Sequence, residues 1–180
     1  GNGLVMNPGE RVEGITNPLW ACYMAAVHFL PVPQEKVSLV IQITGALLLM
    51  LNLLFVMKIA GIVSNGSPAV KYASVFLTAF YLPLINWSLQ GMEVSVITLL
   101  LSVVVWLVFL SFQRERFCPA AYVLLGIGTL IRIDMAVPLG GIMLFCAMAQ
   151  PAFRKKHLLW GMLAIIVLCG FLWPWMWTIS

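Results

Sequence analysis

Four of the six acidic residues of this 180-residue sequence fall in three short polar stretches. Only 9% of the residues are charged, whereas 62% are hydrophobic. The polar stretches are the opening segment GNGLVMNPGERVEGITNPLW, the segment NWSLQGME at 86–93 and the tetrapeptide RIDM at 132–135. Charged groups beside a membrane are costly and tend to mark function. Their carboxylates could act as general bases or hold hydroxyl groups, and their guanidinium groups could hold a phosphate.

The tetrapeptide RIDM interrupts a long apolar stretch, in which unpaired charges could not face lipid. A mutual ion pair would explain Arg132 and Asp134, and the alternative is a guanidinium group that binds a phosphate at the membrane surface. In the middle stretch, Glu93 follows Gly91 at the start of a helix. Its carboxylate would stabilise the positive end of the helix dipole or line a site, and the glycine would allow close approach of a ligand or of another backbone.

The opening segment combines turn residues with charged residues that no turn requires. Asn17 and Pro18 predict the start of a helix, as a cap and a first-turn proline. Glu10, Arg11 and Glu13 have no such structural role. They either form part of a solvated loop or hold a polar ligand at the bilayer surface.

The composition predicts an integral membrane protein, because a soluble domain needs far more polar surface. A bilayer core of about 30 Å is crossed by about 20 apolar residues. We therefore expect six membrane-spanning helices, at residues 37–57, 70–86, 92–112, 119–131, 135–149 and 158–179. Two of them, on either side of the RIDM turn, are short and require that turn to lie in a recess lined by protein. The prediction is thus an all-α membrane protein.

A shorter helix at 17–30 precedes these spans and ends at Pro31, which indicates an interfacial or re-entrant helix. We predict one polytopic domain over residues 1–180. In it, 1–36 form an outer loop and the interfacial helix, and 37–180 carry the six spans. The abrupt start in a turn-rich loop predicts that the sequence is part of a larger chain.

Loop charges orient the predicted spans, because cytoplasmic loops of membrane proteins are enriched in lysine and arginine. With the opening segment outside, the cytoplasmic side receives Lys58, Lys71, Arg114, Arg116, Arg154, Lys155 and Lys156. The outer side keeps only Arg11, Lys36 and Arg132. This topology brings all three polar stretches to the outer face. Loop topology also explains the formal net charge of +4, and no span has the basic stripe expected of a nucleic-acid partner.

The sequence predicts no metal ligands. Four cysteines lie far apart and without the spacing of metal ligands, at Cys22, Cys118, Cys146 and Cys169. The two histidines, His28 and His157, are separated by the predicted topology. The cysteines are explained as small core residues, and the two histidines as isolated side chains.

Three segments resemble elements of the GT-C superfamily of polytopic glycosyltransferases that use lipid-linked sugars, and they most resemble the terminal arabinofuranosyltransferases. GLVMNPGERVEGITNPLW is similar to the first outer loop of those enzymes. WSLQGMEVS, at 87–95, is similar to their W-x-x-x-G-[LM]-E-[TS] element at the head of a transmembrane helix. LLGIGTLIRIDMAVPL, at 124–139, is similar to their G-x-x-x-L-x-R-x-[DE] element between two short helices. The segments occur in the family's order and are spread over residues 3–139 of the chain.

The resemblance implies an inverting glycosyltransferase of the bacterial plasma membrane with its cleft on the outer face. The donor would be a polyprenyl-phosphate sugar, and the acceptor a hydroxyl group of a glycan, lipid or protein. Arg132, with Arg11, would contact the donor phosphate. Glu10, Glu13, Glu93 and Asp134 would orient hydroxyl groups of the sugar or the acceptor. The resemblance leaves open whether a divalent metal cofactor takes part.

The catalytic acid of the family lies in an Asp-containing motif just after the first span, and no Asp precedes Asp134 in this sequence. The resemblance therefore implies a general base upstream of Gly1 and an inactive fragment when this chain is alone. Glu13 is the candidate for a substitute or auxiliary catalytic acid.

Two other functions are compatible with the sequence. A transporter or flippase-like protein would also contain broken helices with a charged break, together with an internal repeat. A non-catalytic membrane subunit would pack against partners through small residues such as Gly126, Gly128, Gly140 and Gly141.

Overall fold

The computed structural model describes residues 17–179, and every regular element in this range is a helix. The all-α prediction is therefore confirmed for these residues. In chain order the elements are α1 (Pro18–His28), α2 (Gln34–Val63), α3 (Pro68–Ala79), α4 (Leu82–Leu89), α5 (Val94–Gln113), α6 (Pro119–Ile131), η1 (Ile133–Met135), α7 (Ala136–Ala149), η2 (Pro151–Phe153) and α8 (Arg154–Ile179).

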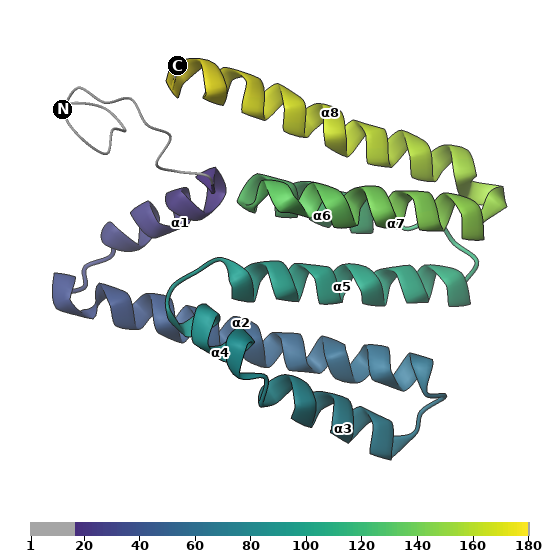
Figure 1. Ribbon diagram of the computed structural model, residues 1–180, viewed down its shortest axis with the longest axis horizontal. Coiled ribbons are helices and arrows are strands. Elements are labelled where there is room, and N and C mark those ends of the chain that lie inside the picture. Colours follow the sequence, from purple (N-terminus) through teal and green to yellow (C-terminus); the bar gives the residue numbers. More distant parts are fainter. Residues whose placement is uncertain (1–16, 180) are drawn as a thin grey trace.

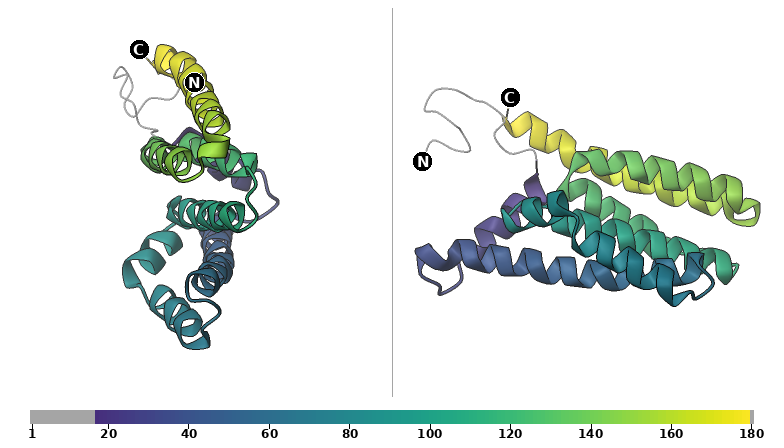
Figure 2. Two further views of the ribbon diagram at one scale, coloured as in Figure 1. Left: turned by 90° about the vertical axis from the view of Figure 1, so that its right-hand side faces the viewer. Right: turned by 60° about the horizontal axis from the view of Figure 1, so that its bottom comes forward.

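The longer helices form one row, in which α5 packs between α2 and α6 (Figure 1). Helices α6 and α7 lie beside each other and both contact α8, and α3 packs on the opposite side of the row against α2. The two views in Figure 2 show the same row from its end and from below. Successive long helices run in opposite directions, so the connections between them gather at the two ends of the bundle.

Helix length limits how many elements can cross a bilayer. Helix α2, with 30 residues, and α5, with 20, are long and apolar enough. Two bent pairs reach that length only when each is counted as one span: α3 with α4, bent by 50°, and η1–α7 with η2 and the first part of α8, bent by 115°. Within the described residues there are thus two to four candidate spans. The predicted six spans are not confirmed.

The surface of the bundle agrees with a membrane environment. Large apolar side chains are exposed along α2, including Leu47, Met50 and Leu54, at 55%, 63% and 49%. Contact with lipid tails would be favourable for such side chains, whereas contact with water would not. The coarse prediction of a membrane protein therefore fits the structure.

The span predicted at 70–86 is interrupted in the structure. Helix α3 ends at Ala79, and α4 begins at Leu82 with Pro83 in its first turn. A proline lacks the amide hydrogen of a helix interior and its ring clashes with the carbonyl four residues earlier. Pro83 therefore explains why the helix does not continue through this region, although the hydropathy does.

The break predicted at residues 132–135 is present. Helix α6 covers 119–131, as expected, and α7 follows after the short 3₁₀ helix η1. Arg132 between them is extended, with φ −150° and ψ 124°. Pro138 in the first turn of α7 could not follow a continuous helix without a clash at the carbonyl of Asp134. The two helices are therefore separate elements.

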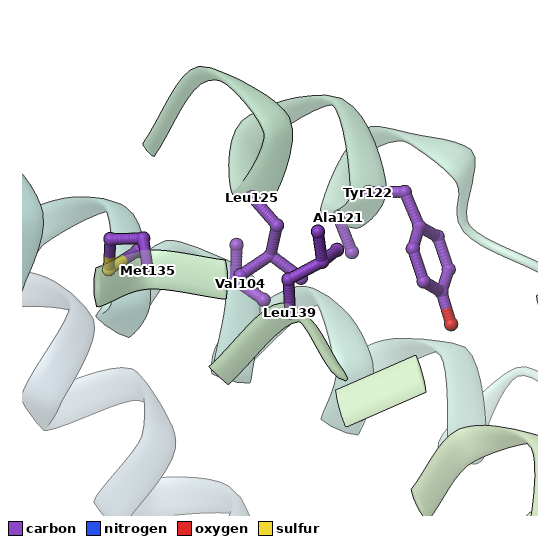
Figure 3. Close-up of a cluster of buried hydrophobic side chains, with 6 residues drawn as sticks. All are labelled: Val104, Ala121, Tyr122, Leu125, Met135 and Leu139. Atoms are coloured by element: carbon purple, nitrogen blue, oxygen red, sulfur yellow. The ribbon is translucent and has the colours of Figure 1, made fainter. Parts of the chain in front are cut away.

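The larger of the two clusters of buried apolar side chains in the described residues lies where α5, α6, η1 and α7 meet. Its buried side chains, drawn in Figure 3, are Val104, Ala121, Tyr122, Leu125, Met135 and Leu139. Lipid tails are as apolar as leucine, so inside a membrane such a core is held mainly by close van der Waals packing. This core fixes the ends of α6 and α7, and thereby the turn at Arg132.

The two ends of the bundle carry different charges. We call the end where α2 and α5 begin and α6 ends the acidic end; among described residues it carries Glu35, Lys36, Glu93, Arg132 and Asp134. We call the opposite end the basic end; it carries Glu115 together with Lys58, Lys71, Arg114, Arg116, Arg154, Lys155 and Lys156. This is the same sorting that the loop charges predict.

Candidate functional site

Three charged side chains meet at the acidic end, and we call them the Arg132 cluster. Nη1 of Arg132 donates a hydrogen bond to Oε1 of Glu93 over 2.8 Å, and Nε of Arg132 donates to Oδ2 of Asp134 over 2.7 Å. Both distances are typical of charge-assisted bonds between a guanidinium group and a carboxylate. The ion pair expected between Arg132 and Asp134 is present. Glu93, 39 residues earlier, joins it.

The side chains of the cluster become more exposed from Glu93, at its bottom, to Asp134, at its rim. Side-chain exposure is 3% for Glu93, 40% for Arg132 and 66% for Asp134. A carboxylate as buried as that of Glu93 is stable in its ionised form only beside a cation, which Arg132 supplies. The arrangement therefore anchors the guanidinium group from below and leaves part of it accessible.

Charge and donors decide what the cluster can bind. One guanidinium group between two carboxylates leaves a single formal negative charge. Hydrogen bonds to Asp134 and then to Glu93 raise the pKa of Arg132, which therefore remains charged at any physiological pH. Its Nη2 donates to none of the described residues. A ligand would thus meet guanidinium N–H groups that these two bonds do not use, chiefly those of Nη2, beside carboxylate oxygens, a combination suited to a phosphate that carries a hydroxyl-rich group.

The turn that carries Glu93 is fixed from two sides. Gly91 has φ +82°, in the left-handed region that favours glycine, and a Cβ there would lie 3.1 Å from Cγ2 of Ile41. Nε1 of Trp20 on α1 donates a hydrogen bond to the carbonyl of Gly91 over 3.0 Å. The groups that approach Gly91 closely are therefore side chains of the protein itself, those of Ile41 and Trp20. Glu93 itself occupies the N-cap position of α5 without a side-chain cap bond, and its carboxylate contacts Arg132 instead.

Helix α4 is held against α2 by a close contact that also places this turn. A Cβ on Gly45 of α2 would lie 2.5 Å from the carbonyl oxygen of Ser88 on α4. No side chain would fit at Gly45 without moving α4. Ser88 is 1% exposed, and the turn at Gly91 follows three residues later.

The short turn at Arg132 is fixed by its own backbone bonds and by the core. The amide of Arg132 donates to the carbonyl of Gly128 over 2.9 Å, and the amide of Met135 donates to the carbonyl of Arg132 over 3.0 Å. Met135 is buried, and a Cβ on Gly128 would lie 2.8 Å from its Cε. The guanidinium group therefore projects from a rigid break between two helices.

The predicted site residues of the opening segment, Glu10, Arg11 and Glu13, lie outside the described residues. The helix expected after them is α1, which begins at Pro18 with Asn17 in the N-cap position. Nδ1 of His28 at its other end is bonded to the carbonyl of Met24 over 2.8 Å. Within residues 17–179, no group of three His, Cys, Asp or Glu side chains is placed to hold a metal ion.

A second polar cluster, at the basic end, was not expected from the sequence. The hydroxyl group of Tyr122 lies 2.8 Å from Nδ1 of His157, and Nε2 of His157 lies 3.0 Å from Oε1 of Gln150. All three side chains are buried. A neutral imidazole that accepts from Tyr122 and donates to Gln150 satisfies every contact. We call these residues the His157 cluster. Its members lie on three elements without a local motif, so no sequence signal could have joined them.

An apolar pocket of about 220 Å³ lies between α6 and α8. It extends along α6 from Tyr122, in the His157 cluster, to Leu130, two residues before Arg132. Its walls are otherwise formed by aliphatic and aromatic residues such as Ile127 and Trp160. The pocket could hold part of a hydrocarbon chain.

Comparison with known protein families, with curated proteins and with solved structures gives no match for this chain.

Proposed function

We propose that the protein transfers a sugar from a polyprenyl-phosphate donor to an acceptor hydroxyl group, with inversion at the anomeric carbon. The observation that carries this proposal is the Arg132 cluster. The two described segments that resemble GT-C glycosyltransferases, 87–95 and 124–139, are distant in the sequence, and their charged residues meet in this cluster. A shared site formed by both segments supports the resemblance better than either motif alone.

In this proposal Arg132 contacts the donor phosphate through the two N–H groups of Nη2. The acceptor oxygen forms a bond to the anomeric carbon while the bond from that carbon to the phosphate oxygen breaks. Polyprenyl phosphate leaves with the bonding electrons, and Arg132 offsets the negative charge that develops on it. Glu93 and Asp134 hold the guanidinium group in place, and the exposed carboxylate of Asp134 orients a sugar hydroxyl group.

The acceptor proton requires a general base. Both carboxylates of the Arg132 cluster are engaged by the guanidinium group, so neither is assigned this role. Glu13 is the acid that the sequence offers for it. We propose Glu10 and Arg11 as further contacts to the substrate.

The apolar pocket between α6 and α8 supports an amphiphilic donor. A polyprenyl phosphate needs an apolar surface for its chain next to a charged site for its phosphate. The pocket reaches Leu130, close in the chain to Arg132, and offers such a surface. The charge difference between the two ends of the bundle supports an orientation with the basic end in the cytoplasm and the Arg132 cluster on the outer face of a bacterial plasma membrane.

The test is sugar transfer in membranes from cells that express the full-length protein containing this sequence, with polyprenyl-phosphate arabinofuranose labelled in the sugar. We expect Arg132→Gln to lower the rate about 100-fold, the loss expected when a group that stabilises developing charge is removed. The combined Glu93→Ala and Arg132→Ala variant should be inactive. Glu35→Gln, which changes an exposed acid at the same end, is the matched control and should transfer at the normal rate.

Normal transfer by the double variant would contradict the roles of these residues. Absence of transfer by the unchanged protein, with this donor and with mannose- and glucose-bearing donors, would contradict the proposed function.

A transporter is a second candidate, favoured by the helix break at α6, η1 and α7 with Arg132 between them. Broken helices of this kind surround the substrate sites of several transporters. Such a protein would move a labelled lipid-linked sugar across proteoliposome membranes without forming a glycosylated product. The two functions are therefore separated by analysis of the product.

A further inference from the structure

A pocket of about 590 Å³ lies between α2, α3 and α5 at the basic end, opposite the Arg132 cluster. It occupies the place where α2 ends, α3 begins and α5 ends (Figure 1). The pocket is lined by two lysines, Lys58 and Lys71, by the side chains of Asn65 and Gln113, and by the ring of Trp106. We call it the lysine pocket.

The two lysines of this pocket are held in place by uncharged groups. Nζ of Lys58 lies 4.6 Å from the ring centroid of Trp106 and 4.8 Å from that of Phe55, within cation–π range. Lys71 is half-buried against α2, and a Cβ on Gly61 would lie 2.9 Å from its Cε. The absence of a side chain at Gly61 is therefore what gives Lys71 its place beside the pocket.

Neither lysine is neutralised within the described part of the chain. Among residues 17–179, the ion pairs are those of Arg132, at the other end of the bundle. Two ammonium groups thus line one concave site together with amide donors and without a carboxylate partner. Such a site attracts an anion with several oxygen acceptors.

The depth of the pocket indicates where that anion comes from. Lys58 follows Gln34, the first residue of α2, by 24 positions, which places it about 36 Å along the helix. A hydrocarbon core is about 30 Å thick, so Lys58 lies at the level of the headgroups when α2 crosses the membrane. The apolar walls, formed by residues such as Leu110, would contact the adjoining glycerol and acyl groups.

We propose that the lysine pocket binds the phosphate headgroup of an anionic phospholipid in the leaflet at the basic end. Basic pockets between membrane helices bind lipid headgroups in this manner. The site is separate from the Arg132 cluster and does not depend on sugar transfer. Bound lipid would link the ends of α2, α3 and α5.

The experiment measures lipid retention by the purified protein in a neutral detergent. Phosphatidylglycerol and phosphatidylcholine are added in equal amounts, and the lipid bound to each protein molecule is identified by native mass spectrometry. Wild-type protein should retain phosphatidylglycerol selectively. The variant Lys58→Gln with Lys71→Gln should bind it about thirtyfold more weakly, because each lysine near an anionic lipid contributes about 1 kcal/mol.

The matched control is Lys155→Gln with Lys156→Gln, which removes the same charge from exposed positions at the same end. It should retain phosphatidylglycerol nearly as well as the wild type. Equal losses in both double variants would indicate a general effect of net charge and would overturn the proposal. So would a wild-type protein without selectivity, which is decisive even if the pocket variant does not fold.

A third arm separates a lipid from a soluble anion. Inorganic phosphate is added at the same concentration as phosphatidylglycerol. Continued retention of the lipid supports a headgroup site that also uses the acyl chain. Complete displacement by inorganic phosphate would show a site for soluble phosphate and would contradict a lipid site.

Discussion

The Arg132 cluster and the His157 cluster are both polar groups within an apolar helical bundle, but they satisfy their hydrogen bonds in different ways. In the His157 cluster three buried, neutral side chains satisfy one another, and all are below 10% exposed. In the Arg132 cluster the charges do not balance, and Arg132 and Asp134 are open to the surroundings.

This difference separates a structural cluster from a candidate site. A neutral network in which both imidazole nitrogens of His157 are paired holds α6, α8 and the turn at Gln150 together and needs no ligand to complete it. A charged network with an accessible rim costs more to form and leaves groups that a ligand can engage. The polar group with incomplete internal pairing is therefore the one to which we assign function.

The largest expected effect on stability is that of Arg132→Ala. Without the guanidinium group, the buried carboxylate of Glu93 has no cation, and we expect the free energy of unfolding to fall by about 3 kcal/mol. Reversible unfolding in mixed micelles measures this change. Adding Glu93→Gln to the same chain should recover most of the lost stability. The control is Lys36→Ala, which removes an exposed lysine at the same end and should not change the stability. An Arg132→Ala protein as stable as the wild type would show that the buried carboxylate of Glu93 does not need the guanidinium group of Arg132.

The next largest effect is expected for His157→Ala. It removes the partner of both Tyr122 and Gln150, and two unsatisfied buried groups should lower the free energy of unfolding by about 2 kcal/mol. The rate of sugar transfer per folded molecule should not change. A specific loss of activity at normal stability would mean that the His157 cluster also has a functional role, which would end the distinction drawn between the two clusters.

A smaller effect is expected for Tyr122→Phe, which keeps the ring and removes only the hydroxyl group. Nδ1 of His157 then lacks its donor, and the free energy of unfolding should fall by about 1 kcal/mol. Unfolding of Tyr81→Phe, an exposed tyrosine, provides the control. If the two variants are equally stable, the bond between Tyr122 and His157 contributes little.

The smallest effect on stability is expected for Asp134→Asn. Because this carboxylate is 66% exposed, its ion pair with Arg132 should contribute about 0.5 kcal/mol. Sugar transfer should nevertheless fall clearly, because the substituted group lies at the rim where we propose that a sugar hydroxyl group is held. A variant with unchanged stability and unchanged transfer would remove Asp134 from the proposed site.

Local signals allowed the sequence to predict one helix break but not the other. At residues 132–135, two charges within an apolar stretch indicated the turn, and the structure has it there. At Pro83, the surrounding apolar residues suggested an uninterrupted span. The proline is nevertheless visible in the sequence. Its missing amide hydrogen indicates the break, and this signal outweighs the hydropathy of the surrounding residues.

Contacts between distant helices could be predicted only in part. The alternation of spans placed Glu93 and Arg132 at one end of the bundle, but their 2.8 Å contact depends on how α5 and α6 pack side by side. For His157, the sequence did not indicate that the side chain would have polar partners. Its partner Tyr122 is 35 residues away and looks like one more aromatic residue of an apolar helix.

The unequal lengths of the helices have a consequence for the surrounding bilayer. Helix α2 is about 45 Å long, whereas α6 and α7 are about 20 Å each. On the side formed by α6 and α7, hydrophobic mismatch would draw the two leaflets toward each other, at a cost of a fraction of a kcal/mol per ångström. If α6 and α7 each cross the membrane, as the six-span prediction has it, the bilayer would be thinned beside the Arg132 cluster. Under the proposed function, a lipid-borne phosphate would then have less distance to travel to reach the guanidinium group.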